Sequence, residues 1–366
     1  MPLPRRKSRS TIPLRRHAQT TLPDAITIGY YPLCDVAPVL VAQHLGFFRK
    51  QGLNVRLQKE IGWATIIKKL ESGEIHAAHA PASLLLQPWQ NTPAPTTSLQ
   101  TAYLLNIHGT SLTLATEFLN LGVKTGMDLA QHMLVHDRSK ILRVGVDAHF
   151  SAQKIYVQQW LQGLQVPEDR IEFMVLPPKQ IPRNLSSGNI DAFCADEPWG
   201  NFCVLQGNGF AEVTPPNTKI PDYPQKAILT TRQFAKKNPE KHSALLRAIQ
   251  DAAILCDQLE YHHDVAKILS HQLDVEPDII EASFACVFPF GAERDKSLQN
   301  HLRFTGEGLN RPSAAKGELL RDGLVSAGLV LSRNAPSQTE LRSIFRGDIY
   351  DSIFDRHITP HPFPGF

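Results

Sequence analysis

The sequence contains no run of about 18 apolar residues, the length that a helix needs to cross a membrane. Its longest apolar stretches, residues 37–45 and 75–86, are interrupted by glutamine, histidine or proline. A hydrophobic content of 42% is still enough to bury a core, and 366 residues correspond to roughly two domains of average size. These features predict a folded protein without a membrane-spanning helix.

A large net charge is also missing, because 38 Lys and Arg residues face 35 Asp and Glu residues. Six of the basic residues lie in residues 1–16, where there is no acidic residue. Without them, 32 basic residues face 35 acidic ones, so the rest of the chain carries a net charge of about −3. This balance disfavours a nucleic-acid binder. Residues 1–24 are predicted to be a basic disordered tail, with contact to an acidic partner or membrane surface as the alternative.

No apolar segment follows Arg5 and Arg6, so residues 1–24 show neither a secretory nor a twin-arginine export signal. The five cysteines are dispersed and odd in number, which is typical of reduced thiols in a cytosol. Among them, Cys194 follows an apolar strand and is predicted to be buried and inert. The sequence therefore predicts a cytoplasmic protein, with a periplasmic or membrane-associated location as the alternative.

Recognisable catalytic and cofactor motifs are absent as well. The chain has no GxSxG, HExxH, GxxxxGK or GxGxxG motif, and no CxxC pair. The histidine pairs 76/79 and 262/263 have poor spacing for a metal site. We therefore expect a binding protein rather than an enzyme, with no cofactor and no metal.

What the sequence does contain is a pattern of short apolar strands and amphipathic helices that occurs twice. The first series predicts strands at 25–30, 53–57 and 75–80 and helices at 37–50 and 63–70. The second predicts strands at 142–146, 171–176 and 190–194 and helices at 152–164 and 178–185. Residues 70–78 and 185–193 are also similar to each other. Two α/β lobes of related build would explain this repetition.

Beyond residue 225 the pattern predicts one more strand, 226–230, and then mostly helices. A long helix is expected at 238–259, with shorter ones near 263–271, 276–285, 312–327 and 337–345. Residues 346–366 are rich in proline at their end and are predicted to be loose. Open α/β sheets bind ligands at the carboxyl ends of their strands, so the ligand site is expected in the cleft between the lobes.

Several sequence blocks carry a resemblance to a known family. They are Gly29–Pro38, Leu45–Phe48, Gly52–Val55, Gly62–Ala64, Gly73–His79, Val175–Pro178, Gly188–Cys194 and Glu197–Gly200. Over residues 25 to 285 the chain resembles the nitrate/bicarbonate/sulfonate-type solute-binding proteins of ABC transporters. The resemblance implies a type II, two-lobed periplasmic-binding-protein-like fold with a helical C-terminal segment. Lobe 1 would comprise residues 25–112 and 225–345, and lobe 2 residues 113–224.

The resemblance implies a small anion ligand, nitrate or nitrite first. Because no export signal is visible, the chain is most similar to the family's cytoplasmic nitrate/nitrite-sensor branch, whose partner is an RNA-binding antitermination regulator. The alternative is a transport receptor that delivers the anion to an ABC permease. A third, disfavoured possibility is a thiamine-pyrimidine-synthase-like enzyme, since the cysteine cluster of that family is missing here.

Three of the expected ligand-binding residues belong to the predicted lobe 1, and two of them, Trp63 and Lys226, match ligand-binding residues of the family. Trp63 corresponds to a tryptophan whose ring N–H donates to a planar oxyanion; otherwise it anchors a helix in the core. His79 lines the cleft or is a satisfied core histidine. Lys226 corresponds to the family's ligand-binding lysine, which would favour a monovalent anion over bicarbonate with a metal; otherwise it is a surface lysine at a strand edge.

The remaining expected ligand-binding residues depart from the nitrate pattern. Thr110 stands in place of an amide, next to Gly109, whose lack of a side chain lets the backbone approach the ligand. His108 would compensate for the shorter donor, or be an exposed loop residue. Gln153 replaces a histidine and would donate to the anion without adding charge, or be an ordinary surface residue. Glu197 is expected to be structural and to cap the helix that follows it.

Overall fold

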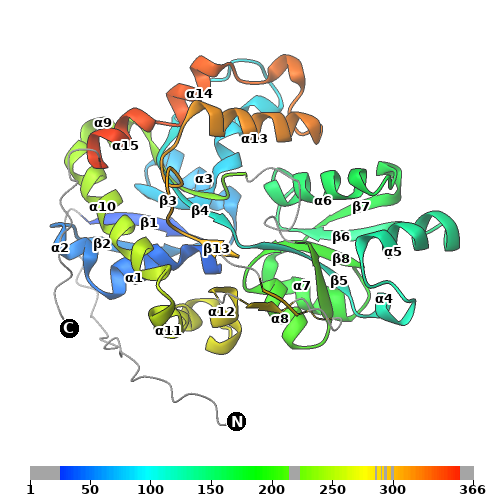
Figure 1. The fold of residues 1–366 in the computed structure, drawn as a ribbon. Helices are drawn as coiled ribbons and strands as arrows, with labels where there is room; N and C mark the ends of the chain where they lie inside the picture. Colours follow the sequence, from blue (N-terminus) through cyan, green and yellow to red (C-terminus); the bar gives the residue numbers. More distant parts are fainter. Residues whose placement is uncertain are drawn as a thin grey trace, which may run out of the picture.

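The computed structural model describes residues 25–213, 223–284, 287–289, 291, 295–297 and 301–354. The described chain folds into two α/β lobes that lie side by side, each built on its own sheet (Figure 1). Sheet 1 has the strand order β13-β4-β10-β3-β1-β2, and sheet 2 has the order β7-β6-β8-β5-β9. The predicted two-lobed α/β fold is confirmed.

Lobe 1 contains the first series of elements and most of the C-terminal part of the chain. Its strands are β1 (Ile26–Tyr30), β2 (Val55–Lys59), β3 (Ala77–Pro81), β4 (Leu99–His108), β10 (Lys226–Thr231) and β13 (Leu302–Arg303). Its helices are α1 (Ala37–His44), α2 (Phe47–Lys50), α3 (Trp63–Ser72), α9 (Arg232–Lys237), α10 (Pro239–Cys256), α11 (His262–Leu273), α12 (Pro277–Phe284), α13 (Ala314–Ser326), α14 (Gln338–Ile344) and α15 (Gly347–Phe354).

Lobe 2 contains the second series. Its strands are β5 (Thr110–Ala115), β6 (Leu142–Val146), β7 (Ile171–Val175), β8 (Ala192–Asp196) and β9 (Gly209–Val213). Its helices are α4 (Glu117–Asn120), α5 (Gly126–Gln131), α6 (Ala152–Gly163), α7 (Ile181–Ser186) and α8 (Trp199–Leu205). A separate two-stranded sheet is formed by β11 (Val287–Pro289) and β12 (Asp295–Ser297).

The two sheets repeat the same topology, as the internal similarity predicts. In both, the first strand pairs in parallel with the second and the third strand of its series. The registers also match, because Gly29 lies opposite Ala78 in lobe 1 and Gly145 opposite Phe193 in lobe 2. The carboxyl ends of β1 and β3 therefore face the cleft from one side, and those of β6 and β8 from the other.

The chain crosses between the lobes at Gly109, three residues before the predicted boundary at residue 112. There β4 of sheet 1 ends and β5 of sheet 2 begins, which Figure 1 shows as one cyan segment running from lobe to lobe. His108 and Gly109 have positive φ angles of 59° and 82°. The positive φ of Gly109 is a conformation that other residues rarely adopt, and a Cβ atom there would also lie 2.6 Å from Cδ1 of Leu302, so glycine is favoured at this crossing.

Two predicted segments differ from the structure. The helix predicted over 37–50 is divided into α1 and α2, because Gly46 adopts a left-handed conformation with φ of 74°. The prediction that residues 346–366 are loose is wrong for α15, whose Tyr350 and Phe354 rings lie 6.3 Å and 6.2 Å from the ring of Tyr103 on β4. Aromatic burial against the sheet fixes this helix, a tertiary contact without a strong local signal.

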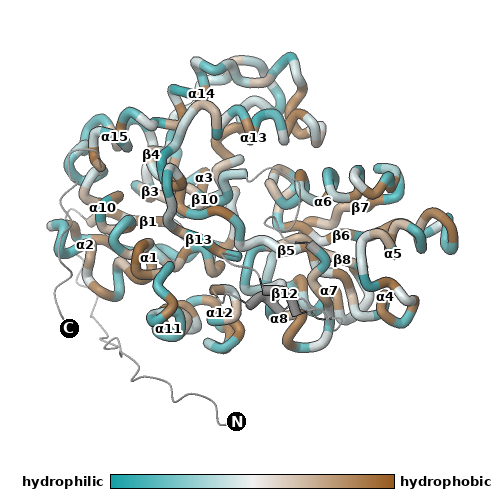
Figure 2. Tube along the Cα trace, in the orientation of Figure 1, coloured by the Kyte–Doolittle hydropathy of each residue, from teal (hydrophilic) through white to brown (hydrophobic). Residues whose placement is uncertain are grey.

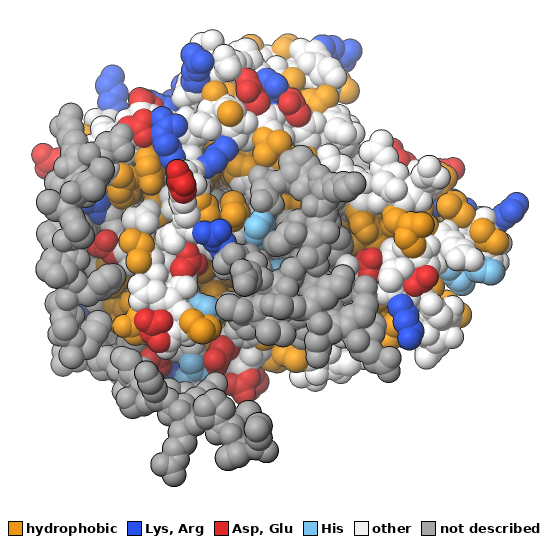
Figure 3. Space-filling view, viewed as in Figure 1, with side chains coloured by type: hydrophobic (Ala, Val, Ile, Leu, Met, Phe, Trp, Pro, Cys, Tyr) orange, Lys and Arg blue, Asp and Glu red, His pale blue; other side chains and the backbone are white. Residues whose placement is uncertain are grey.

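Hydrophobic residues follow the central strands of both sheets, whereas hydrophilic residues lie mostly on outer loops and helix surfaces (Figure 2). On the face shown in Figure 3, acidic and basic side chains are interspersed on the parts not drawn in grey, in keeping with the small net charge. No helix among the described residues is both long and apolar enough to span a membrane.

Candidate functional site: an interlobe cluster of carboxylates around one lysine

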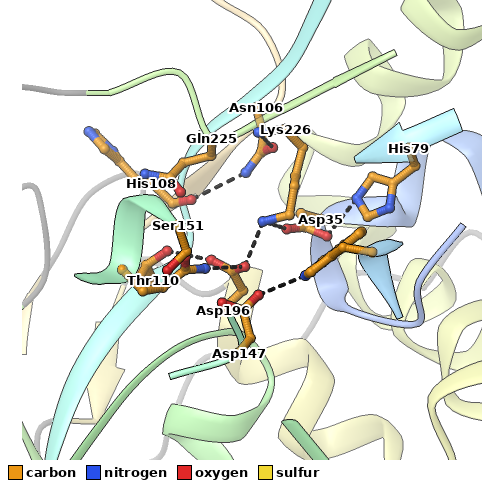
Figure 4. Close-up of polar contacts among 12 residues, drawn as sticks. Asp35, His79, Asn106, His108, Thr110, Asp147, Ser151, Asp196, Gln225 and Lys226 are labelled. Atoms are coloured by element: carbon orange, nitrogen blue, oxygen red, sulfur yellow. Dashed lines mark hydrogen bonds and ion pairs between the residues drawn. The ribbon is translucent and has the colours of Figure 1, made fainter. Parts of the chain in front are cut away.

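Lys226 lies at the centre of the contact between the lobes, although it is the first residue of β10 and belongs to lobe 1 (Figure 4). Its side chain is only 1% exposed. The Nζ atom lies 2.9 Å from Oδ2 of Asp35 in lobe 1 and 2.5 Å from Oδ2 of Asp196 in lobe 2. It also lies 5.7 Å from the centre of the Trp63 ring. Lys226 is therefore a buried cation shared by both lobes, not a surface lysine.

The Asp196 carboxylate is the point on which the other predicted donors converge. Asp196 is the last residue of β8, and its Oδ2 accepts the Gln153 side-chain amide at 2.8 Å as well as Lys226. Its Oδ1 accepts the Thr110 hydroxyl at 2.5 Å. Thr110, Gln153 and Lys226 come from β5, α6 and β10, so the structure brings together three residues that the sequence analysis selected separately.

The Trp63 ring makes a second contact across the cleft. Its Nε1–H donates to Oδ2 of Asp147 at 2.9 Å, and Asp147 directly follows β6 in lobe 2. The Oδ1 atom of Asp147 is buried and has no hydrogen-bond partner within the described part of the chain. Trp63 thus donates to a carboxylate, which is the chemistry expected for a planar oxyanion.

His79 and His108 are each linked to Lys226 through another residue. His79 on β3 is fully buried, and its Nε2 is 2.8 Å from Oδ1 of Asp35, so it supports the partner of Lys226. His108 is also buried, and its backbone oxygen accepts the Asn106 side-chain amide at 3.2 Å. The oxygen of the Asn106 side chain in turn accepts the backbone N–H of Lys226. The backbone of His108 therefore helps to position Lys226 through Asn106, and Gly109 follows it at the crossing between the lobes.

Burial and mutual charge set the protonation of this cluster. Burial by itself raises the pKa of Asp35, but Lys226 and His79 outweigh it and lower the value to about 2. Burial and the neighbouring Asp196 raise the pKa of Asp147 to about 6. Burial likewise raises the pKa of Asp196, in spite of the opposing effect of Lys226. Although burial lowers the pKa of Lys226, its acidic neighbours raise the value above normal, so Lys226 is a cation.

The three carboxylates of the site were not selected from the sequence. Asp147 and Asp196 follow or end adjacent parallel strands, and that position was the available signal, because the carboxyl ends of neighbouring strands meet at one edge of a sheet. Asp35 lies within the Gly29–Pro38 block but was not singled out there.

A second buried polar group lies behind the site and confirms the structural role predicted for Glu197. Its Oε2 accepts the backbone N–H of Asn201 at 3.1 Å in the first turns of α8, and its Oε1 is 3.1 Å from Nε2 of His301. Cys194 is buried, as predicted, and burial together with nearby carboxylates raises the pKa of its thiol.

Away from the cleft, His263, Asp278 and Glu281 place ligand atoms within 4.8 Å of one another on α11 and α12. His263 Nδ1 already lies 2.7 Å from Glu281 Oε2. This cluster was not found from sequence, because His263 lies at the start of α11 whereas Asp278 and Glu281 lie on α12. The expectation of no structural metal stays a prediction.

With this geometry established, the chain can be compared with known proteins. The profile of the NMT1-like family matches residues 20–270, which is more than half of the chain. The chain belongs to the NMT1-like family. The predicted resemblance to nitrate- and sulfonate-type solute-binding proteins is confirmed by this match together with the relatives described next.

Two relatives from cyanobacteria illustrate the similarity of this NMT1-like protein. It is 29% identical over 301 residues to the nitrate import ATP-binding protein NrtC of Synechocystis sp.. The aligned region covers 80% of this chain and 44% of NrtC. It is 31% identical over 247 residues to the nitrate/nitrite binding protein NrtA of Synechococcus elongatus, covering 63% of this chain and 55% of NrtA. The chain thus spans about half the length of these relatives.

Solved structures share the fold. The periplasmic nitrate-binding protein NrtA from Synechocystis PCC 6803 superposes with a TM-score of 0.82 at 22% identity, over 92% of this chain and 90% of NrtA. The desulfurization enzyme DSZB superposes with a TM-score of 0.59 at 14% identity, over 91% of this chain and 99% of DSZB. Because binding proteins and an enzyme share this fold, only the site can distinguish their functions.

Proposed function

We propose that the protein is a two-lobed solute receptor for a small planar oxyanion, nitrate or nitrite in the first place. The observation that carries this proposal is the donor set around the Asp196 carboxylate. Lys226, Gln153 and Thr110 hold one planar, singly charged O–C–O group, and both of its oxygens accept hydrogen bonds. Nitrite and nitrate present a planar O–N–O edge of the same charge, so the donors that hold a carboxylate also suit these anions.

The donors come from both lobes, which couples anion binding to closure. Lys226 belongs to lobe 1, whereas Gln153 on α6 belongs to lobe 2 and Thr110 begins the first strand after the crossing. An anion between them is contacted fully only when the lobes are together. The closed state therefore binds the anion more tightly than an open state, and this difference in affinity drives closure.

Import is the role that the similarities support better than sensing. The relatives reported above are named for nitrate import and nitrate/nitrite binding, and none of these names denotes a regulator. The proposed partner is therefore an ABC permease with its ATPase, in place of the antitermination regulator expected from the sequence. A periplasmic location, which is that of the Synechocystis nitrate-binding protein NrtA, belongs to this proposal and replaces the cytoplasmic expectation.

The proposal is tested by thermal unfolding and isothermal titration with nitrate, nitrite, bicarbonate, sulfate and methanesulfonate. An anion at 100 times its Kd should stabilise the protein by about 2.7 kcal/mol, which raises Tm by several degrees. Nitrate or nitrite is expected to give the largest shift, and Lys226→Met to abolish it. The proposal is wrong if no anion of this panel binds either the wild-type protein or the Asp196→Ala variant introduced below.

A further inference from the structure

We infer that Asp196 is a specificity-determining residue whose carboxylate acts as a built-in anion and competes with the ligand for Lys226, Gln153 and Thr110. This inference rests on the proposed function and deepens it, because it states what an incoming anion must displace.

The first argument is geometric. Asp196 occupies the place at which the predicted anion donors meet, and each of its two oxygens is used. Lys226 and Gln153 contact Oδ2 at 2.5 Å and 2.8 Å, and Thr110 contacts Oδ1 at 2.5 Å. All four side chains are at least nine-tenths buried. A nitrate ion cannot receive the same three hydrogen bonds while the carboxylate holds them.

The second argument is electrostatic. Three carboxyl groups, those of Asp35, Asp147 and Asp196, surround the single buried ammonium group of Lys226 (Figure 4). His79 faces Asp35 from β3, and Trp63 faces Asp147 from α3. Among the residues that the structure describes, Lys226 is the lysine paired with Asp35 and Asp196, so a monovalent anion added to the set would stand beside three carboxyl groups and share one cation with them. Its binding therefore requires the Asp196 carboxylate to leave the donors.

The third argument concerns the lobes. Asp196 ends β8 in lobe 2, whereas Lys226 begins β10 in lobe 1, so their ion pair spans the cleft. A ligand that bridges the lobes makes the same kind of connection. Removing the carboxylate should consequently leave the lobes apart until an anion replaces it.

The experiment compares nitrate and nitrite binding by the wild-type protein with binding by Asp196→Ala and Asp196→Asn, using isothermal titration at pH 7. Asp196→Ala vacates the donors, and one released charge-assisted contact corresponds to about 10- to 100-fold tighter anion binding. Asp196→Asn keeps the side-chain size and removes only the charge, so it should give a smaller gain and covers the case in which the alanine variant does not fold. Asp169→Asn, which removes an exposed carboxylate from the same lobe, is the matched control and should bind as the wild type does.

Small-angle X-ray scattering provides a second readout. The wild-type protein should be compact without ligand, whereas Asp196→Ala should be more extended and become compact when nitrate is added. Weaker or unchanged nitrate binding by both Asp196 variants, with binding by the wild type, would overturn the inference and leave the proposed receptor function standing. Absence of binding by all variants would instead overturn the receptor function.

Discussion

The two lobes have the same scaffold but contribute different groups to two of the contacts between them. Their sheets share strand order and register, with β1, β2 and β3 corresponding to β6, β7 and β8. Yet lobe 1 presents the ammonium group of Lys226 and the ring N–H of Trp63, whereas lobe 2 presents the carboxylates of Asp196 and Asp147. Lobe 1 therefore donates and lobe 2 accepts in both contacts.

This difference shows that two lobes of the same topology can carry complementary groups where they contact each other, with no difference in their architecture. The matched registers place equivalent strand ends of the two lobes near each other, and the side chains close to those ends determine which contacts form between the lobes. Complementary charges on the two sides hold the lobes together. The following substitutions remove one side of that complementarity at a time, beginning with the largest expected effect.

Replacing Lys226 by Met should destabilise the protein most. It leaves the buried carboxylates of Asp35 and Asp196 without their cation, which for a buried ion pair costs about 3–5 kcal/mol. Urea denaturation at pH 7 measures the loss. Lys179→Met is the matched control, because Lys179 also pairs with an aspartate of the other lobe, Asp274, but both groups are largely exposed. Equal losses in the two variants would contradict the central role of Lys226.

Replacing Asp147 by Asn should stabilise the protein increasingly as the pH rises above about 4, with the full effect above about pH 6. The pKa of Asp147 is raised to about 6 in the folded state, so the native protein binds an extra proton between about pH 4 and 6. Its stability therefore falls as the pH rises through this range, by roughly 2–3 kcal/mol in total. Asparagine avoids this loss and can still accept the Trp63 N–H.

Thermal unfolding at pH 5 and pH 8 checks this prediction. The Asp147→Asn variant should have a higher Tm than the wild type at pH 8 and a smaller advantage at pH 5. A variant that is less stable than the wild type at pH 8 would show that the ionised carboxylate is stabilising. The contribution of Asp35 to stability depends on pH in the opposite direction. Its pKa is lowered to about 2, so this contribution is present above about pH 4 and is lost as the pH falls towards 2.

Replacing Trp63 by Phe should have the smallest effect of the three. It removes the ring N–H from Asp147 Oδ2, and a hydrogen bond to a charged acceptor contributes about 1.5–3 kcal/mol at most. The loss should be clear at pH 8, where Asp147 is ionised, and smaller at pH 5. A double-mutant cycle with Asp147→Asn measures the coupling, which should be smaller in the asparagine background. A pH-independent loss would assign Trp63 to core packing instead.

The proposed ligand-binding residues could be found from sequence to the extent that they lie within recognisable blocks. Trp63, Gln153, Thr110 and Lys226 were selected from the family resemblance, and the structure gathers the last three around one carboxylate. Their partner was missed because Asp196 looked like part of a helix-capping turn with Glu197. Only Glu197 has that capping role.

The sequence by itself determined the two repeated series of strands and helices, because the periodicity of apolar residues is a local property. It did not predict β4, β5 and β9, which complete the two sheets. The strand predicted at 142–146 is β6 in full. Only the tertiary structure decided which charged side chains of the two lobes contact each other. Asp196 and Lys226 belong to different sheets, and they meet because the chain crosses from one lobe to the other at Gly109. Burial then strengthens the electrostatic attraction between Lys226 and Asp196, because two charges removed from water attract each other far more than two exposed charges do.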